Sequence, residues 1–169
     1  RRADQDPRAA AGRPEHHARG HAGDGERRRL EQRVPEDRPL TMLRFHLATI
    51  MVDDYDRAIN YYVGKLGFTL VEDTDMGDGK RWVVVRPGPD GTGLQLAKAT
   101  TSEQRAAIGN QTGGPVGFFL RTDDFDATYR EWTSKGVTFI EEPRHEEYGT
   151  VAVFEDLYGN KWDLIQPTT

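Results

Sequence analysis

An internal repeat constrains the fold of this chain more than any other feature of its 169 residues. The segment VDDYD at residues 52–56 recurs as TDDFD at residues 122–126, 70 positions later. Each copy opens a helical pattern of apolar side chains, with one of its aspartates as N-cap, and Gly67 or Gly136 ends the pattern. Strand-like runs follow in both halves. Each half is therefore predicted to consist of a strand, a helix and three strands.

The two halves are expected to share one core, because neither small sheet could bury its apolar face alone. Their opening strands are predicted at residues 43–51 and 116–121, which are nearly continuous in apolar side chains, as in strands that are covered on both faces. The predicted fold class is α+β, with two tandem βαβββ modules. The modules span about residues 42–98 and 115–167, and a polar linker at residues 99–114 joins them.

Residues 1–41 differ in composition from the rest of the chain. They hold ten Arg, eight Asp or Glu and three of the five His, but no aromatic side chain. Such a segment buries too little apolar surface to offset its loss of conformational entropy. We therefore expect residues 1–41 to be a disordered leader, or an extension translated from upstream of a natural start at Met42. Residues 42–169 are predicted to form the folded domain.

Composition also excludes several classes of protein. The chain has no Cys, which excludes a disulfide framework, a thiolate nucleophile and a zinc site built on Cys. It has no run of about 18 apolar residues and no apolar signal-peptide core, so we expect a cytoplasmic protein with no membrane partner. Residues 42–169 hold 13 basic and 20 acidic side chains, a charge of -7, which argues against nucleic acid as a partner. The three Arg at residues 27–29 could form a nucleic-acid arm, but Glu26 and Glu31 dilute that run.

Two stretches of the predicted domain carry a recognisable pattern. They are residues 52–62 (VDDYDRAINYY), which residues 65–68 (KLGF) follow, and residues 154–164 (FEDLYGNKWDL). These stretches resemble the vicinal oxygen chelate superfamily, which includes glyoxalase I, bleomycin-resistance proteins and extradiol dioxygenases. The resemblance implies that the two modules form a curved mixed sheet with a central cleft. It also implies one divalent metal ion in the cleft (Zn, Ni, Mn or Fe) and a homodimer.

The resemblance places one metal ligand on the first and on the last strand of each module. These four positions fall on Leu47, Gln95, Gly117 and Asp163. His46 is the neighbour of Leu47, and a bulge, or alignment of the motif on Asp53 instead of Asp54, would bring it to the ligand face. The resemblance therefore implies a metal set of His46, Gln95 and Asp163. The glycine at position 117 argues against thiol transferases and extradiol dioxygenases, which generally require histidine there.

Each of these three residues also has a purely structural interpretation. His46 can lie on the outer face of its strand or at a subunit contact. Gln95 and Asp163 have apolar neighbours and can be a buried hydrogen-bonded pair, since an unpaired amide or carboxylate in such surroundings is costly. Because the repeat relates Gln95 to Asp163, we expect these two side chains to face each other across the cleft.

Four further side chains are candidates for contact with a small-molecule ligand. Trp82 starts an internal strand of the first module and is predicted in the core or in the pocket wall. Phe119 alternates with Phe118, so one of the two faces the cleft. His145 and Tyr148 lie in an acidic segment between two strands of the second module. That segment is either a solvated loop or a flap over the cleft, in which His145 would act as acid or base.

Two functions follow from these candidates. The first is a glyoxalase-like lyase or isomerase, in which a divalent metal acts as a Lewis acid and stabilises an enolate; no catalytic residue is assigned. The alternative is a non-catalytic protein of the bleomycin-resistance type, which sequesters an aromatic or cationic compound. The negative charge of the predicted domain favours a cationic ligand.

Overall fold

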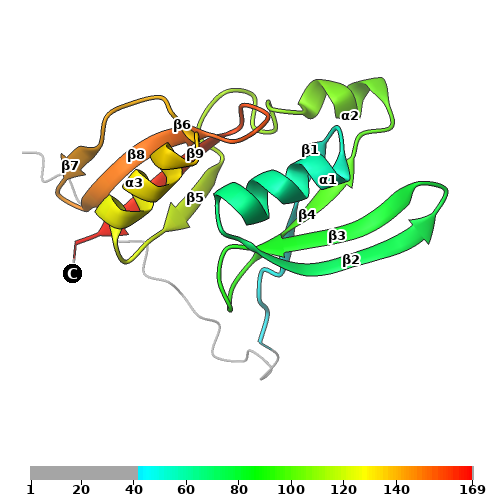
Figure 1. Cartoon of the computed structure of the whole chain (residues 1–169), viewed down its shortest axis with the longest axis horizontal. Coiled ribbons are helices and arrows are strands. Elements are labelled where there is room, and N and C mark those ends of the chain that lie inside the picture. Colours follow the sequence, from blue (N-terminus) through cyan, green and yellow to red (C-terminus); the bar gives the residue numbers. More distant parts are fainter. Residues whose placement is uncertain (1–41, 169) are drawn as a thin grey trace, which may run out of the picture. The chain divides into compact units, whose positions relative to one another are not determined.

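The computed structural model describes residues 42–168 (Figure 1). The leader predicted at residues 1–41 lies outside the described residues. Within them, strands and helices follow one another in two successive modules, as the repeat predicts. In this part of the chain, no helix has the length and apolar character that a membrane span requires.

The first module contains a four-stranded sheet. β1 (Leu47–Val52) lies at one edge and is parallel to β4 (Gly93–Lys98). β3 (Lys80–Arg86) is antiparallel to both β4 and β2 (Thr69–Gly77), which forms the other edge. The strand order is β1-β4-β3-β2. A parallel pair at one edge and two antiparallel pairs make this a mixed sheet.

The second module repeats this arrangement with one strand more. β5 (Phe118–Arg121) is parallel to β9 (Lys161–Pro167), which is antiparallel to β8 (Gly149–Glu155). Two short strands, β6 (Thr138–Phe139) and β7 (Arg144–Glu146), pair with β8. β7 lies in the acidic segment for which the sequence leaves a solvated loop or a flap open. The α+β fold of two tandem modules is confirmed, and its strands form two separate sheets, one for each module.

The helices of the two modules begin in the same way. α1 (Tyr55–Ile59) has Asp54 as its N-cap and α3 (Phe125–Ser134) has Asp124. Each carboxylate accepts a hydrogen bond of 2.9 Å from the backbone N–H three residues ahead. The glycines that follow the helical segments have φ of +75° and +73°, which residues with a Cβ rarely adopt. The N-caps and the stops that the repeat predicts are therefore confirmed.

The helical segment of the first module changes from an α-helix to a π-helix, which its sequence pattern does not predict. α1 continues as the π-helix η1 (Asn60–Lys65), after which the backbone N–H of Leu66 donates to the carbonyl of Tyr61, five residues back. The neighbours Tyr61 and Tyr62 are both buried, at 6% and 0% exposed. Successive residues are separated by a smaller angle in the wider turn than in an α-helix, so both rings can point toward the second module.

The linker between the modules also protects a sheet edge. It contains α2 (Ser102–Ala107), which Thr101 caps. Farther along, the Gln111 amide donates to the carbonyl of Thr49 at 2.9 Å and accepts from the backbone N–H of Met51 at 3.2 Å. This side chain occupies part of the free edge of β1, where an unpaired strand could otherwise recruit another chain.

Side-chain alternation gives each sheet two faces, which we call the covered face and the open face. The covered face points toward the helix of its own module, so that α1 lies over the first sheet and α3 over the second (Figure 1). The open face carries the intervening residues of each strand. The core side chains of the covered faces are Ile50, Val52, Val83, Val85, Leu94 and Leu96 in the first sheet, and Ala152, Phe154, Trp162 and Leu164 in the second.

The two modules meet through groups on their covered sides. The ring of Tyr62 packs against Phe68 and against Trp162, with ring centroids 5.8 and 6.3 Å apart. The Tyr62 hydroxyl donates to Oδ2 of Asp156 at 2.7 Å. Burial, together with the neighbouring Asp156 carboxylate, raises the pKa of Tyr62 well above its usual value. The junction therefore combines aromatic packing with one buried, charge-assisted hydrogen bond.

Asp156 is the polar centre of this junction and is only 6% exposed. Its Oδ2 also accepts from the side-chain nitrogens of Asn160 and Trp162, at 2.9 and 3.1 Å. Its Oδ1 accepts from the backbone N–H groups of Tyr158 and Asn160, at 2.9 and 3.0 Å. Both oxygens of this buried carboxylate are thus fully hydrogen-bonded, which compensates for its removal from water.

Candidate functional site

The strand register gives Gln95 and Asp163 equivalent places on the two open faces. Gln95 on β4 pairs with Thr49 on β1 and Val84 on β3. Asp163 on β9 pairs with Phe119 on β5 and Val153 on β8. The repeat therefore aligns the two residues as the sequence predicts, but their neighbours differ: a hydroxyl lies beside Gln95, and an aromatic ring lies beside Asp163.

Gln95 has a hydrogen-bond partner on its own sheet. The Thr49 hydroxyl donates to Oε1 of Gln95 at 2.8 Å. Both side chains line a cavity of about 430 Å³ whose other walls come from the first module and from the linker, including Met51, Ala97 and Gln104. Gln95 thus faces a space bounded by its own module and the linker, and its amide oxygen is already bonded.

Asp163 lacks such a partner. Its Oδ1 is buried and accepts no hydrogen bond from the residues that the structure describes. Burial raises the pKa of Asp163; the nearby Glu141 carboxylate raises it further, and Arg144 opposes the shift. Phe119 lies beside it in the register and is 68% exposed. The open face of the second sheet therefore presents an unsatisfied carboxylate next to an exposed ring.

Glu141 and Arg144 form the polar rim of this face. Glu141 Oε1 accepts from the Arg144 guanidinium at 3.1 Å and from the backbone N–H of Val153 at 3.0 Å. Arg144 also donates to Glu146 at 2.6 Å. Arg144 thus donates to two carboxylates, and Oδ1 of Asp163 accepts no hydrogen bond from it. From the sequence, this segment is recognised only as rich in charged residues. The ion pairs of Arg144 can be identified only once β7 is aligned on β8.

Two of the four residues at the ligand positions have no side-chain atom that can bind a metal ion. Leu47 occupies the position on β1, on the open face beside Gly93, and a leucine cannot bind a metal. Gly117 occupies the position in the second module, and a Cβ there would overlap the side chain of Thr112. Among the described residues, no three His, Asp or Glu side chains lie close enough together to hold a metal ion. Asp163 is the one carboxylate in register.

His46 lies ahead of β1 and is exposed. Its carbonyl accepts a hydrogen bond of 2.9 Å from the backbone N–H of Gly93. It is one residue out of register with the open face, because Leu47 and Thr49 lie on that face. Among the described residues, Gln95 accepts from Thr49 and Oδ1 of Asp163 is unbonded, so neither is hydrogen-bonded to the His46 ring at these atoms.

The other predicted ligand contacts lie on different parts of the fold. Trp82 is half-buried on the open face of β3, in register with Thr74. His145 bonds to the Thr150 hydroxyl at 3.1 Å and lines a cavity of about 640 Å³ at the start of α3. Tyr148, in the turn between β7 and β8, is 55% exposed. Of these three, only Trp82 is on an open face.

The sequence does not single out Arg86, although it belongs to the open face of the first sheet. Arg86 ends β3, two residues beyond Val84 and four beyond Trp82, so alternation along this strand is the signal that finds it. Its Nε is buried without a hydrogen-bond partner among the residues that the structure describes. Its Nη1 donates a long hydrogen bond of 3.5 Å to the carbonyl of Pro89.

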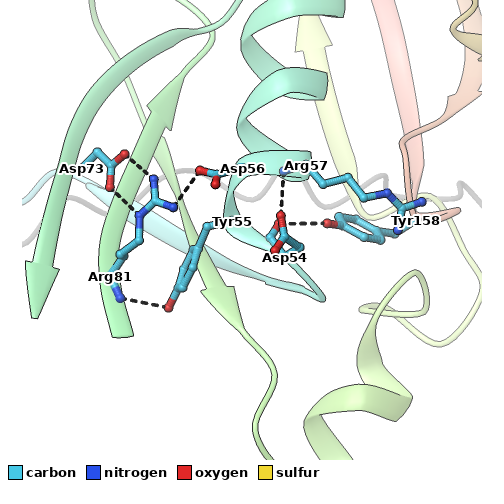
Figure 2. A network of polar contacts seen from close by, with 7 residues as sticks. All are labelled: Asp54, Tyr55, Asp56, Arg57, Asp73, Arg81 and Tyr158. Atoms are coloured by element: carbon cyan, nitrogen blue, oxygen red, sulfur yellow. Dashed lines mark hydrogen bonds and ion pairs between the residues drawn. The ribbon is translucent and has the colours of Figure 1, made fainter. Parts of the chain in front are cut away.

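A separate polar network fixes the start of α1 and is scaffolding (Figure 2). Arg81 on β3 donates to both carboxylate oxygens of Asp73, at 2.9 and 2.5 Å, and to Asp56 at 2.7 Å. The Tyr55 hydroxyl accepts from the backbone N–H of Arg81 at 3.2 Å. This pairing lowers the pKa of Asp73 and raises that of Arg81. The ionic groups of this network are therefore already paired.

Comparison with known sequences agrees with the fold. The sequence profile of the Glyoxalase/Bleomycin resistance protein/Dioxygenase superfamily matches residues 44–164. An uncharacterized protein of Shewanella frigidimarina (strain NCIMB 400) is 54% identical over 123 residues, which cover 72% of this chain and 90% of that protein. The uncharacterized protein YurT of Bacillus subtilis (strain 168) is 34% identical over 129 residues, covering 73% and 99%.

Solved structures show the same similarity. UcmS2 is 31% identical and superposes with a TM-score of 0.65, covering 74% of this chain and 98% of that one. TnmS3, an antibiotic binding protein from Streptomyces sp. CB03234, is 30% identical with a TM-score of 0.61, covering 77% and 100%. These similarities extend over nearly the whole length of both neighbours.

Proposed function

Because the chain belongs to the Glyoxalase/Bleomycin resistance protein/Dioxygenase superfamily, we propose that it is a non-catalytic protein that binds a small organic cation with a flat, apolar body. The ligand would lie on the open face of the second sheet. The observation that carries this proposal is the buried Oδ1 of Asp163, which lacks a partner among the described residues and lies beside the exposed Phe119.

A bound ligand would supply the hydrogen-bond donor that Oδ1 of Asp163 lacks among the described residues. A buried carboxylate oxygen without a donor costs free energy, and an ammonium or protonated amine removes that cost when it donates there. The exposed ring of Phe119 offers a surface on which a flat ligand can stack, and the negative face of the ring attracts a cation. The apolar residues Val151, Val153 and Ile165 line the same face around Asp163.

Similarity to known proteins supports binding over catalysis. TnmS3 is described as an antibiotic binding protein, and the similarity covers 100% of TnmS3 and 77% of this chain. A small-molecule ligand is therefore the coarse function that both the fold and this neighbour favour. The cationic character of the ligand rests mainly on Asp163.

A titration tests the proposal. Ethidium and acriflavine are flat organic cations, and calorimetry should detect saturable binding of at least one of them to the full chain. The Asp163→Asn variant should bind it at least about tenfold more weakly, since it loses a charge-assisted contact. The matched control is Asp90→Asn, which removes the same charge from an exposed turn and should leave binding unchanged. Equal binding by both variants would contradict the proposal.

A metal-dependent lyase or isomerase is the weaker proposal, because Leu47 and Gly117 occupy two of the four ligand positions. It predicts that Ni²⁺ or Zn²⁺ raises the melting temperature of the protein and that Asp163→Ala abolishes this shift. Stabilisation of the wild type and of the variant by the same amount would count against Asp163 as a ligand.

We also propose that the chain forms a homodimer. Apolar side chains are exposed on or near the strands of both modules, including Met76 at 58%, Phe119 at 68% and Ile140 at 46%. Such surfaces are typical of contacts with another protein or with a ligand. Light scattering at micromolar concentration should give twice the mass of the chain, and a purely monomeric mass would refute the dimer.

A further inference from the structure

A cavity of about 430 Å³ lies at the end of the first sheet, where β4 leads into the linker. The ladder between β3 and β4 ends at the pair Val83–Leu96, although β3 begins at Lys80 and β4 continues to Lys98. The start of β3 and the end of β4 both line the cavity. All of its lining residues belong to the first module or to the linker of the same chain, so the cavity needs no second copy.

Two glutamine amides line this cavity, and the protein uses only their oxygen atoms. Oε1 of Gln95 accepts from the Thr49 hydroxyl at 2.8 Å. Oε1 of Gln104 accepts from the backbone N–H groups of Thr100 and Thr101, at 2.8 and 3.3 Å, and completes the capping box of α2. Neither NH₂ group donates to a residue that the structure describes. Both amides therefore offer donors, rather than acceptors, to a ligand.

The charged side chains around the cavity are mainly cationic. Lys80, Arg81 and Lys98 line it, together with one carboxylate, that of Asp78. The Arg81 guanidinium is turned toward two carboxylates outside the cavity (Figure 2), whereas the two ammonium groups form no ion pair within the described part of the chain. This surplus of positive charge is local, because residues 42–169 as a whole are acidic.

We infer that this cavity binds a small organic oxyanion, either a carboxylate or a phosphate ester. The anionic group accepts from the two glutamine amides and is attracted by the ammonium groups of Lys80 and Lys98. Charge-assisted hydrogen bonds are stronger than those between neutral groups, so these donors gain more from an anion than from water. Met51 and Ala97 supply apolar surface for the organic body, and the volume is within the usual range of small-molecule pockets.

This site is separate from the one proposed for an organic cation. It contains no residue of the second module, and it takes the opposite charge. Of the four ligand positions it includes only Gln95, which acts here as a donor and not as a metal ligand. The inference therefore does not depend on the proposed function, and Asp163→Asn should leave the binding of anions unchanged.

NMR titration of the isotope-labelled full chain with phenyl phosphate, benzoate and benzamide tests the site. Benzamide has the shape of benzoate without its charge. At least one of the two anions should shift the side-chain NH₂ signals of Gln95 and Gln104 in a saturable way, and the tighter of the two identifies the oxyanion. Benzamide should bind at least about tenfold more weakly than that anion. The inference is overturned if neither anion shifts these signals, or if benzamide binds as tightly as the anions.

Gln104→Glu separates the donor from the helix cap. A glutamate keeps an oxygen for the capping box, so α2 stays capped, but it replaces the NH₂ group by a second carboxylate oxygen. We expect the affinity for the anion to fall at least about tenfold. The matched control, Gln166→Glu, adds the same charge on β9, keeps the acceptor for the backbone N–H of Phe125 and should bind like the wild type. Equal weakening by the two variants would overturn the site.

Lysine variants test the source of the attraction. Lys98→Gln should weaken binding about three- to tenfold, whereas Lys98→Arg, which keeps the charge, should retain most of the affinity. Lys135→Gln removes the same charge from α3, outside the cavity, and should have no effect. If Lys135→Gln weakens binding as much as Lys98→Gln does, the anion responds only to the overall charge of the protein, and the inference is overturned.

Discussion

Asp156 and Asp163 lie seven positions apart in the sequence, and their environments are opposite. Asp156 is 6% exposed and accepts five hydrogen bonds, among them one from Tyr62 of the first module. Asp163 lies on an open face and has a buried oxygen with no partner among the described residues. The same side chain thus holds the fold together at one position and leaves a charge unsatisfied at the other.

This difference shows that hydrogen bonding, rather than burial, distinguishes a structural carboxylate from a functional one. A satisfied carboxylate contributes to stability, and its removal leaves its donors without partners. An unsatisfied carboxylate costs stability in the free protein, a cost typical of sites kept for function. Substitutions at the two positions should therefore change the free energy of unfolding in opposite directions.

The largest effect is expected from Asp156→Ala. Five donors lose their acceptor in a buried place, so we expect a loss of about 3–4 kcal/mol in the free energy of unfolding. Urea denaturation followed by tryptophan fluorescence measures it. Asp163→Ala is the control, and no loss is expected from it because it removes a carboxylate that has an unbonded, buried oxygen. Similar losses at the two positions would remove the distinction between the two acids.

Tyr62→Phe is expected to have the second largest effect. It deletes one charge-assisted hydrogen bond to Asp156 and keeps the aromatic packing, so a loss of about 1.5–2 kcal/mol should follow. Tyr61→Phe removes a longer bond, of 3.2 Å, to the carbonyl of Glu155 and should cost less. If the two variants unfold at the same urea concentration, Asp156 is not the centre of the module junction.

A smaller effect is expected at the position equivalent to Asp163. Thr49→Val removes the donor to Gln95 and should cost about 0.5–1 kcal/mol. Adding Gln95→Leu replaces both partners by apolar groups, so the double variant should be more stable than the sum of the two single losses predicts. Additive losses would show that the hydrogen bond contributes nothing, and that Gln95 is no more satisfied than Asp163.

The smallest effect, with opposite sign, is expected for Asp163→Asn. Burial, with Glu141 adding and Arg144 opposing, raises the pKa of Asp163, so the folded state binds its proton more tightly than the unfolded state does. The stability of the wild type therefore falls as the pH rises from the unfolded-state value of about 3.9 through the higher folded value. Above that interval, Asp163→Asn should melt about 1–2 °C higher than the wild type.

The pH dependence of this gain is its check. Because the wild-type carboxyl becomes protonated in acid, the difference in melting temperature should shrink as the pH falls toward 4. Asp90→Asn, in an exposed turn, should show no such trend. A variant that is less stable than the wild type at neutral pH would mean that Asp163 has a partner in solution.

Local chemistry allowed much of the fold to be predicted from the sequence. The repeat places Asp54 and Asp124 as N-caps, and alternation aligns Gln95 with Asp163, because both features depend on residues near in sequence or related by the repeat. The change to a π-helix at Asn60 does not follow from the helical pattern, which fits a regular helix as well. That change depends on the packing of Tyr61 and Tyr62 against the other module.

The candidate site could be predicted only in part, for the same reason. Asp163 was found by register, but the pairing of its neighbour Arg144 with Glu141 and Glu146 depends on the alignment of β7 on β8. The sequence does place His46 one residue away from the ligand position at Leu47, but it does not show that Arg86 ends its strand with an unbonded Nε. These features depend on contacts between distant segments.

The junction at Asp156 has a consequence for the order in which the chain folds. Tyr62 and its carboxylate partner are 94 residues apart, so the hydrogen bond closes a loop that spans most of the folded unit. During synthesis, the first module leaves the ribosome with Tyr61 and Tyr62 lacking their partners until β8 and β9 follow. Contacts of such long range slow folding and prolong the exposure of apolar surface. The last strands to be synthesised, β8 and β9, therefore complete the core of the first module.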